Sequence, residues 1–167
     1  MKYGTMSYLS VDGKVLIIQK AKRENDPNSG YFTLPGGKLK PHERRTPQGR
    51  LEGAIRETKE ETGLRLINPV FRGIILFHNR ERTFDNWKNP QDYLVYIFEA
   101  KKYTGILKSS SDEGIPLWID ETEISNLPQN HGDKKMYEWL KDSRNFKGII
   151  KHRGNILDES GTSVRYL

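Results

Sequence analysis

The feature that most constrains this chain is a pair of glycines followed, after a bridge, by a cluster of acids that ends at another glycine. The two parts read Gly36-Gly37-Lys38-Leu39-Lys40-Pro41-His42-Glu43 and Arg56-Glu57-Thr58-Lys59-Glu60-Glu61-Thr62-Gly63-Leu64. Thr46 suits a helix N-cap, Pro47 suits the first helical position, and Gly63 suits a left-handed helix end. The sequence therefore predicts a glycine turn that leads into a helix of ~16 residues, or ~24 Å.

The predicted helix carries its acids on one side. At ~100° per residue, Glu57, Glu60 and Glu61 fall within about a third of the circumference. The opposite flank is more apolar and is expected to pack against the protein; its residues are Leu51, Ala54, Ile55, Thr58 and Thr62. Simple solvation is the commoner explanation for three glutamates on a surface helix, and it stays open at this point.

Three like charges on adjacent helical turns repel one another, so a counter-charge is expected. Arg56 and Lys59 lie only at the edge of the acidic arc, which favours a divalent cation as the partner. Mg²⁺ accepts oxygen ligands and is often held jointly by one or two carboxylates and by substrate phosphates. The acidic face therefore indicates phosphate chemistry with Mg²⁺, and with Mn²⁺ as the alternative ion.

The whole pattern resembles the Nudix box, in which Gly-x5-Glu-x7-Arg-Glu-U-x-Glu-Glu-x-Gly-U, with U a bulky apolar residue, forms a loop-helix-loop metal site. Gly37, Glu43 and the run from Arg56 to Leu64 fill nearly every fixed position. The resemblance implies an α/β (α+β) fold of the Nudix type, which is an α/β/α sandwich with a mixed β-sheet between helices.

Two departures from the box bear on residue roles. Twelve residues, 44–55, separate Glu43 from Arg56, five more than the pattern allows. The surplus contains residues that a loop tolerates, namely Arg44, Arg45, Pro47 and Gly49. We expect the insertion to lie in the loop ahead of the helix, which leaves the contribution of Glu43 to the metal site open. Thr58 stands where the family has a larger apolar residue, and we expect it to pack less surface.

Length and composition limit the remaining options. The chain has 167 residues, and we expect a single domain over residues 1–167. It contains no cysteine, and its four histidines are scattered, so any metal is expected to be bound by carboxylates. The sequence shows neither a signal peptide nor a transmembrane run, so we expect a cytoplasmic location and no membrane partner.

The formal net charge of +6 allows three interpretations, which are a nucleic acid, a membrane surface or an anionic small molecule as the partner. Lys and Arg are spread along the whole chain, without the clustered basic and aromatic runs of a dedicated nucleic-acid face. We therefore expect a solvated basic surface and no dedicated nucleic-acid partner. The sequence leaves the oligomeric state open.

Apolar patterns predict the strands and shorter helices around the acidic helix. The expected strands are 3–10, 15–19, 70–78 and 92–100, followed by short strands or edge segments at 146–151 and 163–166. The expected shorter helices are 120–127 and 133–141. Asp12-Gly13 predicts a hairpin turn between the first two strands. The loop 79–91, with Trp87 and Pro90, is either a lid or a long hairpin connection.

Beyond the box, the C-terminal half resembles that of the MutT-like enzymes that remove oxidised purine nucleotides. The similar segments are Glu113-Gly114-Ile115-Pro116-Leu117-Trp118, Phe146-Lys147-Gly148 and Gly154-Asn155-Ile156-Leu157-Asp158. The resemblance implies that Glu57, Glu60 and Glu61 bind metal, together with the carbonyl of Gly36. It further implies that Arg56 orients these acids and that Glu113 approaches the site from a distant loop. A surface ion pair for Arg56 and a solvated turn for Glu113 are the alternatives.

The same resemblance supplies candidate substrate contacts. It implies that Lys20 reaches the substrate phosphates and that Thr33 and Asp133 line or read the base. Relatives that favour oxidised guanine commonly have a second acid or a tryptophan just before the position of Asp133. This chain has Asn130-His131-Gly132 there, so the base preference is open.

The resemblance as a whole implies a Mg²⁺-dependent pyrophosphohydrolase. Its expected substrate is a nucleoside triphosphate, including an oxidised purine such as 8-oxo-dGTP, which is cleaved to a monophosphate and pyrophosphate. The metal would neutralise phosphate oxygens and activate the attacking water, and a glutamate is a candidate to accept the water proton.

Three rival functions stay open at the level of sequence. The first is hydrolysis of a dinucleotide or of a sugar nucleotide such as ADP-ribose, because fold and box do not fix the leaving group. The second is a sensor that binds a nucleotide without cutting it, although such a protein has no need for three repelling glutamates. The third is polynucleotide binding through the positive charge, which would weaken steeply with salt.

Overall fold

The computed structural model describes residues 1–24, 29–81, 91–154 and 156–167. Its helices and strands follow in the order β1 Lys2–Val11, β2 Lys14–Lys20, β3 Phe32–Thr33, β4 Gly36–Lys38, α1 Pro47–Thr62, β5 Leu64–Ile67, β6 Val70–Glu81, β7 Tyr93–Ala100, β8 Lys102–Gly105, β9 Gly114–Asp120, η1 Glu121–Asn126, α2 His131–Leu140, β10 Phe146–Arg153, β11 Ile156–Leu157, η2 Glu159–Gly161 and β12 Ser163–Tyr166. The segments η1 and η2 are 3₁₀ helices. None of the described helices is long and apolar enough to cross a membrane.

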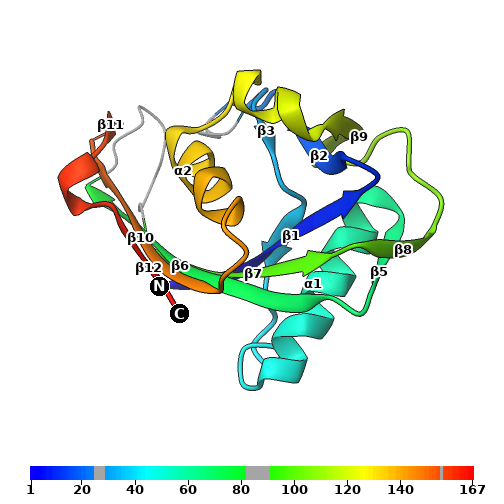
Figure 1. Ribbon diagram of the computed structural model, residues 1–167, viewed down its shortest axis with the longest axis horizontal. Helices are drawn as coiled ribbons and strands as arrows, with labels where there is room; N and C mark the ends of the chain where they lie inside the picture. Colours follow the sequence, from blue (N-terminus) through cyan, green and yellow to red (C-terminus); the bar gives the residue numbers. More distant parts are fainter. Residues whose placement is uncertain (25–28, 82–90, 155) are drawn as a thin grey trace.

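A mixed β-sheet forms the centre of the molecule (Figure 1). Its main path runs β11-β10-β6-β7-β1-β2-β3, with β12 paired to β10, β4 to β1 and β9 to β2. The pairs β1/β7 and β6/β10 are parallel, whereas β1/β2, β6/β7 and β2/β9 are antiparallel. Strands β5 and β8 form a separate two-stranded sheet.

The two long helices cover opposite faces of this sheet (Figure 1). Val95 and Ile97 of β7 pack into the cluster that contains Met136 and other buried residues of α2. The intervening Tyr96 and Phe98 pack into a second cluster with Ala54 of α1 and with Leu39. Successive side chains of a strand point to opposite faces, so β7 is buried on both sides. The predicted sandwich with a mixed sheet between helices is confirmed.

Helix α1 has the boundaries that its local signals predict. Thr46 has an extended backbone, and its Oγ1 accepts a hydrogen bond from the amide of Gly49 at 3.0 Å. Pro47 occupies the first turn, where its missing N–H costs nothing. Gly63 ends the helix with a φ of 81°, and its amide donates to the carbonyl of Lys59 at 2.8 Å.

Several strand predictions are also confirmed, and their extents are corrected. The first two strands form the predicted hairpin, in which Val11 lies opposite Lys14. Strand β6 continues to Glu81, so Asn79 belongs to a strand and not to the predicted loop. Residues 82–90 of that loop, with Trp87 and Pro90, lie outside the described residues. Strand β10 lies between β6 and the pair β11/β12 and is not an edge segment.

The second long helix begins two residues earlier than predicted. Its N-cap is Asn130, whose Oδ1 accepts a hydrogen bond from the amide of Gly132 at 3.2 Å. Asp133 lies within the first turn and is buried. The apolar spacing around Met136, Tyr137 and Leu140 placed the helix correctly, but Asn130 is the residue that caps it. Asp133 is therefore not needed as a cap.

Candidate active site

A cavity of about 900 Å³ collects most of the predicted site residues from distant parts of the chain. It opens where β1 and β7 begin, between α1, α2 and the loop that precedes β9. The predicted residues that line it are Lys20, Thr33, Gly36, Glu57, Glu60, Glu61, Glu113 and Asp133. Arg56 does not line this cavity and contacts the acids from beside it. The acids, Lys20 and the candidate base contacts therefore share one pocket.

The glycine turn at β4 lies directly against the acidic face of α1. Glu61 is only 6% exposed, and its Oε2 accepts a hydrogen bond from the amide of Gly36 at 3.0 Å. A Cβ atom at Gly37 would lie 2.1 Å from Oε2 of Glu57, and one at Gly36 would lie 2.1 Å from the carbonyl oxygen of Thr5. Glycine is required at position 36, because a side chain there would meet the backbone of β1, and a side chain at position 37 would displace the carboxylate of Glu57.

Arg56 supplies part of the counter-charge for which the sequence favoured a divalent metal ion. Its Nη1 lies 2.6 Å from Oε1 of Glu57 and 3.3 Å from Oε2 of Glu60. Its Nε and Nη2 donate to the two carboxylate oxygens of Glu43 at 2.8 and 2.9 Å. By angle Arg56 lies at the edge of the acidic arc, but its long side chain reaches three acids, Glu43, Glu57 and Glu60.

Glu43 takes part in this network despite the insertion that separates it from Arg56 in the sequence. It is 5% exposed, and its Oε2 also accepts the amide of Lys40 at 2.7 Å. The hydrogen bonds to Arg56 lower the pKa of Glu43, and the hydrogen bond to Glu43 is the main cause that raises the pKa of Arg56. Both groups are therefore charged over the physiological pH range and form one fixed unit.

The insertion is accommodated largely inside the helix. Of residues 44–55 only the first three precede α1, so the prediction of a loop insertion is wrong for Pro47 and Gly49. A Cβ atom at Gly49 would lie 2.8 Å from the carbonyl oxygen of Glu43, and one at Gly53 would lie 2.3 Å from Cδ2 of Leu39. These two glycines, one turn apart, let the preceding loop fold onto α1. Glu43 can then reach Arg56 despite the extra residues.

Thr58 is fully buried, and its hydroxyl donates to Oγ of Ser7 on β1 at 2.8 Å. A larger apolar side chain would leave the buried Ser7 hydroxyl without this partner. Thr58 therefore ties α1 to the sheet by a hydrogen bond.

Lys20 and Glu113 meet at the side of the pocket that faces the acids. Strands β2 and β9 pair antiparallel, and Lys20 lies opposite Gly114, which brings the neighbouring Glu113 to the lysine. Nζ of Lys20 lies 2.9 Å from Oε2 of Glu113. The hydrogen bond to Lys20 is the main cause that lowers the pKa of Glu113. The structure thus places these two predicted residues together, as a charged pair beside Glu61.

The opposite side of the pocket carries polar groups, some of which the sequence did not reveal. Besides Thr33 and Asp133, it is lined by Asn79, Asn130 and His152. Nδ1 of His152 lies 2.9 Å from Oδ1 of Asn79, and both residues are buried. They meet because β6 and β10 are parallel neighbours, a pairing that no local sequence signal predicts. Phe77 and Tyr93 add aromatic surface nearby.

The acids of α1 have the donor chemistry for a divalent cation. Burial raises the pKa of Glu57, against the effect of Arg56, and burial raises the pKa of Glu61 to about 7. Desolvated carboxylates of this kind gain from a nearby cation. Within the described ranges, no three His, Cys, Asp or Glu side chains already converge on a metal position, because Arg56 and the amide of Gly36 engage the carboxylates. The oxygen-only donor set fits a hard ion.

Known proteins share this sequence and fold. The NUDIX domain model matches residues 5–140. The Nudix hydrolase YvcI of Bacillus subtilis (strain 168) is 33% identical over 136 residues, which cover 81% of this chain and 77% of YvcI. The ADP-ribose pyrophosphatase of Methanocaldococcus jannaschii is 33% identical over 119 residues, which cover 71% of this chain and 59% of that protein. The crystal structure of a MutT protein from Bacillus halodurans has a TM-score of 0.78 at 27% identity, over 99% of this chain and 97% of that one.

The family match covers most of the chain and includes the glycine turn, α1 and the loop of Glu113. The fold match covers 99% of the chain and so extends the similarity beyond residue 140, to β10 and the strands that follow it. The chain therefore belongs to the Nudix hydrolase family, whose members act on phosphoric anhydride bonds.

Proposed function

We propose that this Nudix hydrolase cleaves nucleoside triphosphates, including oxidised purine forms, to a monophosphate and pyrophosphate in the presence of Mg²⁺ or Mn²⁺. The observation that carries the proposal is the division of one pocket into two ends. One end holds Glu57, Glu60 and Glu61 beside Lys20, and the other holds buried polar groups and aromatic surface. An acidic and basic end suits phosphates with their metal ion, whereas the other end suits a base with hydrogen-bonding edges.

Each charged residue has a distinct task in this proposal. Nudix hydrolases generally use divalent metal ions, and here Glu57, Glu60, Glu61 and the carbonyl of Gly36 would hold one. The ion neutralises phosphate oxygens and acidifies water when bound. Arg56, clamped by Glu43, fixes the direction of the carboxylates of Glu57 and Glu60. Such preorganisation removes the cost of reorienting charges during the reaction.

The remaining residues bind and orient the substrate. Lys20 supplies a positive charge to the phosphates, and its pairing with Glu113 holds the ammonium at the wall of the pocket. Glu113 is ionised at neutral pH, because Lys20 lowers its pKa, and it adds a negative charge opposite α1. Thr33 and Asp133 contact the base. A substrate bound across both ends is held with its phosphate chain against the acids of α1.

Hydrolysis of ADP-ribose is the second candidate function. The observation in its favour is the 33% identity to the ADP-ribose pyrophosphatase of M. jannaschii, although the chain spans only 59% of that protein. Both candidates use the same acids and differ in the group beyond the scissile phosphate. A sensor that binds nucleotides without cutting them has no use for the partly buried carboxylate of Glu57 and the buried carboxylate of Glu61, whose desolvation is costly.

A panel of substrates tests the proposed function. The chain is incubated with Mg²⁺ and with dGTP, 8-oxo-dGTP, dATP, dCTP or ADP-ribose, and the products are separated by ion-exchange chromatography. Release of pyrophosphate and a monophosphate from a triphosphate supports the proposal. Cleavage of ADP-ribose alone would replace it by the second candidate, and hydrolysis of no compound would reject both.

Replacing Lys20 by alanine is expected to raise KM for the triphosphate about tenfold, with kcat changed by less than about threefold. A charge that contacts phosphate equally in the ground state and the transition state acts mainly on binding. Initial-rate measurements over a range of substrate concentrations separate the two parameters. Lys14→Ala is the matched control, because Lys14 is an exposed residue at the other end of the same strand. An unchanged KM in Lys20→Ala would mean that Lys20 only pairs with Glu113 and does not bind the substrate phosphates.

Replacing Asp133 by asparagine is expected to reduce the preference for purine over pyrimidine triphosphates. The ratio of their kcat/KM values is expected to fall roughly ten- to hundredfold. A buried carboxylate accepts hydrogen bonds that a wrong base cannot supply, and asparagine changes that pattern with little change in shape. The helix cap is not disturbed, because Asn130 provides it. The measurement compares kcat/KM for 8-oxo-dGTP, dGTP, dATP and dCTP, together with the dependence on Mg²⁺. The same ranking in both proteins would exclude base recognition by Asp133.

A further inference from the structure

A row of positive charges runs from the rim of the pocket, at Lys38, along the segment that leads into α1. We call it the basic surface and define it by Lys2, Lys38, Lys40, Arg44, Arg45 and Arg50. Lys38, Lys40 and Arg45 are exposed, and the other three are partly exposed. Glu43, the acid within this segment, is buried and paired with Arg56. Among the described residues no acidic side chain forms an ion pair with any of the six.

The fold brings Lys2 of β1 to the same end of the sheet as this segment, with its side chain over Tyr93, on the face of β7 opposite to Tyr96. Strand β4 pairs with β1 so that Gly4 lies opposite Lys38, and the amide of Leu39 donates to the carbonyl of Tyr3 at 3.0 Å. Continuing this register brings Lys2 beside Lys40. Nε of Arg50 donates to the carbonyl of Arg44 at 3.0 Å, which joins the first turn of α1 to the same row.

Tyrosine rings hold three of the cations in place. The guanidinium groups of Arg44 and Arg50 lie over Tyr3 and Tyr96, at 5.0 and 4.6 Å from the ring centroids. Nζ of Lys2 lies over Tyr93 at 5.3 Å. These contacts fix the charges and occupy one face of each ring. The basic surface therefore offers positioned charge and no free stacking platform of its own, which suits a phosphate backbone better than unstacked bases.

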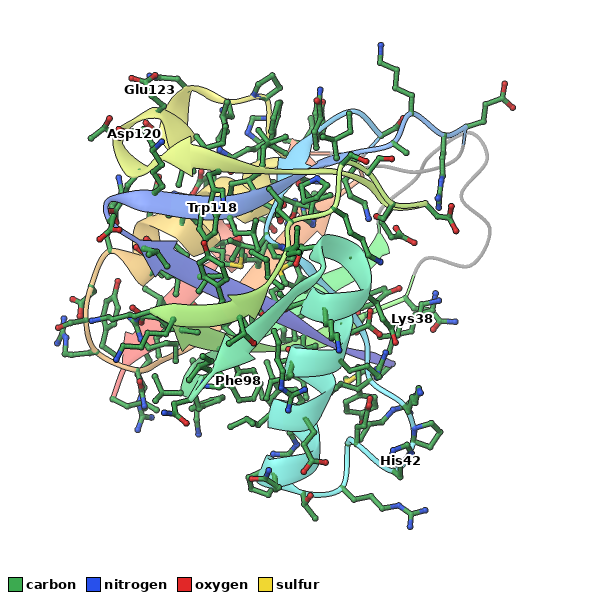
Figure 2. The ribbon with its side chains drawn as sticks, turned by 90° about the vertical axis from the view of Figure 1, so that its right-hand side faces the viewer. Lys38, His42, Phe98, Trp118, Asp120 and Glu123 are labelled. Carbon is green, nitrogen blue, oxygen red and sulfur yellow. The ribbon has the colours of Figure 1, made fainter. Side chains whose placement is uncertain are left out.

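The basic surface joins the pocket that holds the candidate active site. Lys38 lines the cavity, and so does Tyr93, which lies under Lys2. Nη2 of Arg56 donates to the carbonyl of Lys38 at 3.1 Å and fixes this junction to the acid network. Figure 2 shows Lys38 and His42 along one edge of the molecule beside α1, in the same stretch of chain. A polyanion on the basic surface thus passes the opening of a pocket built for nucleotides.

We propose that the basic surface binds the sugar-phosphate backbone of single-stranded nucleic acid. Five of the six cations lie along one segment of chain, residues 38–50, which matches one backbone, and the exposed members are charged and not apolar. A membrane partner is less well supported, because interfacial binding needs apolar side chains that enter the bilayer, and the row provides none. This interaction goes beyond nucleotide hydrolysis and is measurable without it.

Fluorescence anisotropy with a labelled single-stranded oligonucleotide of about 12 nucleotides tests the proposal, over a series of salt concentrations. The test variant is Lys40→Glu/Arg45→Glu, because both side chains are exposed and outside the acid network. The matched control is Lys14→Glu/Lys101→Glu, which has the same net charge. These exposed lysines lie at the other end of β1, since Val11 pairs with Lys14 and Leu9 with Ala100, ~30 Å from Lys2.

The test variant is expected to bind at least about tenfold more weakly at low salt, and its slope of log affinity against log salt is expected to fall by about 1.4, or ~0.7 for each lost phosphate contact. The control is expected to stay within about threefold of the unmodified chain. Equal losses in both variants would mean a response to net charge alone and would overturn the proposal. The proposal would also be overturned if the chain bound anionic phospholipid vesicles through Lys40 and Arg45 and did not bind the oligonucleotide.

Nucleoside triphosphate hydrolysis is measured on the same three proteins and is expected to be equal in all of them. A chain that binds the oligonucleotide through the basic surface but hydrolyses nothing would refute the proposed function and leave this inference standing. Hydrolysis without oligonucleotide binding would support the proposed function and refute this inference.

Discussion

Replacement of Glu61 by glutamine is expected to lower kcat/KM for hydrolysis more than about a hundredfold without loss of the fold. Residues that only support a metal ligand cost 10- to 100-fold when they are removed, so a ligand itself is expected to cost at least as much. Glutamine keeps the shape of the side chain and can accept the amide of Gly36 as Glu61 does. What it lacks is the negative charge that faces the pocket.

Steady-state kinetics and a thermal unfolding curve distinguish this loss from simple damage. The unfolding temperature of Glu61→Gln is expected to stay level or to rise, because burial disfavours the charged carboxylate. Glu52→Gln is the control, since Glu52 is an exposed acid on the same helix that lies outside the main pocket. Full turnover by Glu61→Gln would remove Glu61 from the site.

Replacement of Arg56 by methionine is expected to destabilise the protein by about 3 kcal/mol as well as to impair hydrolysis. The substitution leaves Glu43, which is buried, without its charged partner. It also releases Glu57 and Glu60, which repel each other once Arg56 is absent. Urea unfolding gives the free energy, and kinetics on the folded variant give the loss of activity.

A second substitution separates the structural role of Arg56 from its positioning role. In Arg56→Met/Glu43→Leu the buried charge is removed together with its partner, so much of the lost stability is expected to return. Activity is expected to stay low, because nothing then directs Glu57 and Glu60 toward the substrate. Recovery of both stability and activity would contradict a positioning role. A free energy of unfolding for Arg56→Met within about 0.5 kcal/mol of that of the unmodified chain would contradict the structural role of Arg56.

The parts of the fold that local chemistry determines were predictable from sequence. The ends of α1 follow from Thr46, Pro47 and Gly63, each of which acts on the backbone within one helical turn. The first hairpin follows from Asp12, which has a φ of 51°, and from Gly13, with a φ of 75°. The acidic arc on α1 follows from helical spacing alone. Such signals need no knowledge of the rest of the chain.

Long-range packing explains what the sequence did not reveal. The burial of Glu61 depends on the turn at Gly36, and the contact between Asn79 and His152 depends on the parallel pairing of β6 with β10. The basic surface likewise depends on the pairing of β1 with β4. The periodic pattern of apolar residues in a sequence shows which residues share a face of one helix or strand. It does not determine which helices and strands become neighbours.

The reach of long side chains is a separate reason for error. Arg56 is at the edge of the acidic arc by angle, yet its guanidinium contacts Glu43, Glu57 and Glu60. Gly49 was assigned to a loop from the sequence, yet Gly49 and Gly53 both lie in α1, where their missing side chains accommodate the preceding loop. For Arg56 the spacing was right, and the contacts depended on atoms far from its Cα position.

The central claim is that the acidic face of α1 binds the divalent ion that hydrolysis requires, and a titration with Mn²⁺ followed by electron paramagnetic resonance tests it most directly. The measurement records free Mn²⁺ in the presence of the unmodified chain, of Glu52→Gln, and of Glu57→Gln/Glu60→Gln/Glu61→Gln. We expect the first two to bind Mn²⁺ alike and the triple variant to bind it at least about a hundredfold more weakly, in parallel with the loss of hydrolysis. Identical titration curves for the unmodified chain and the triple variant would contradict the claim.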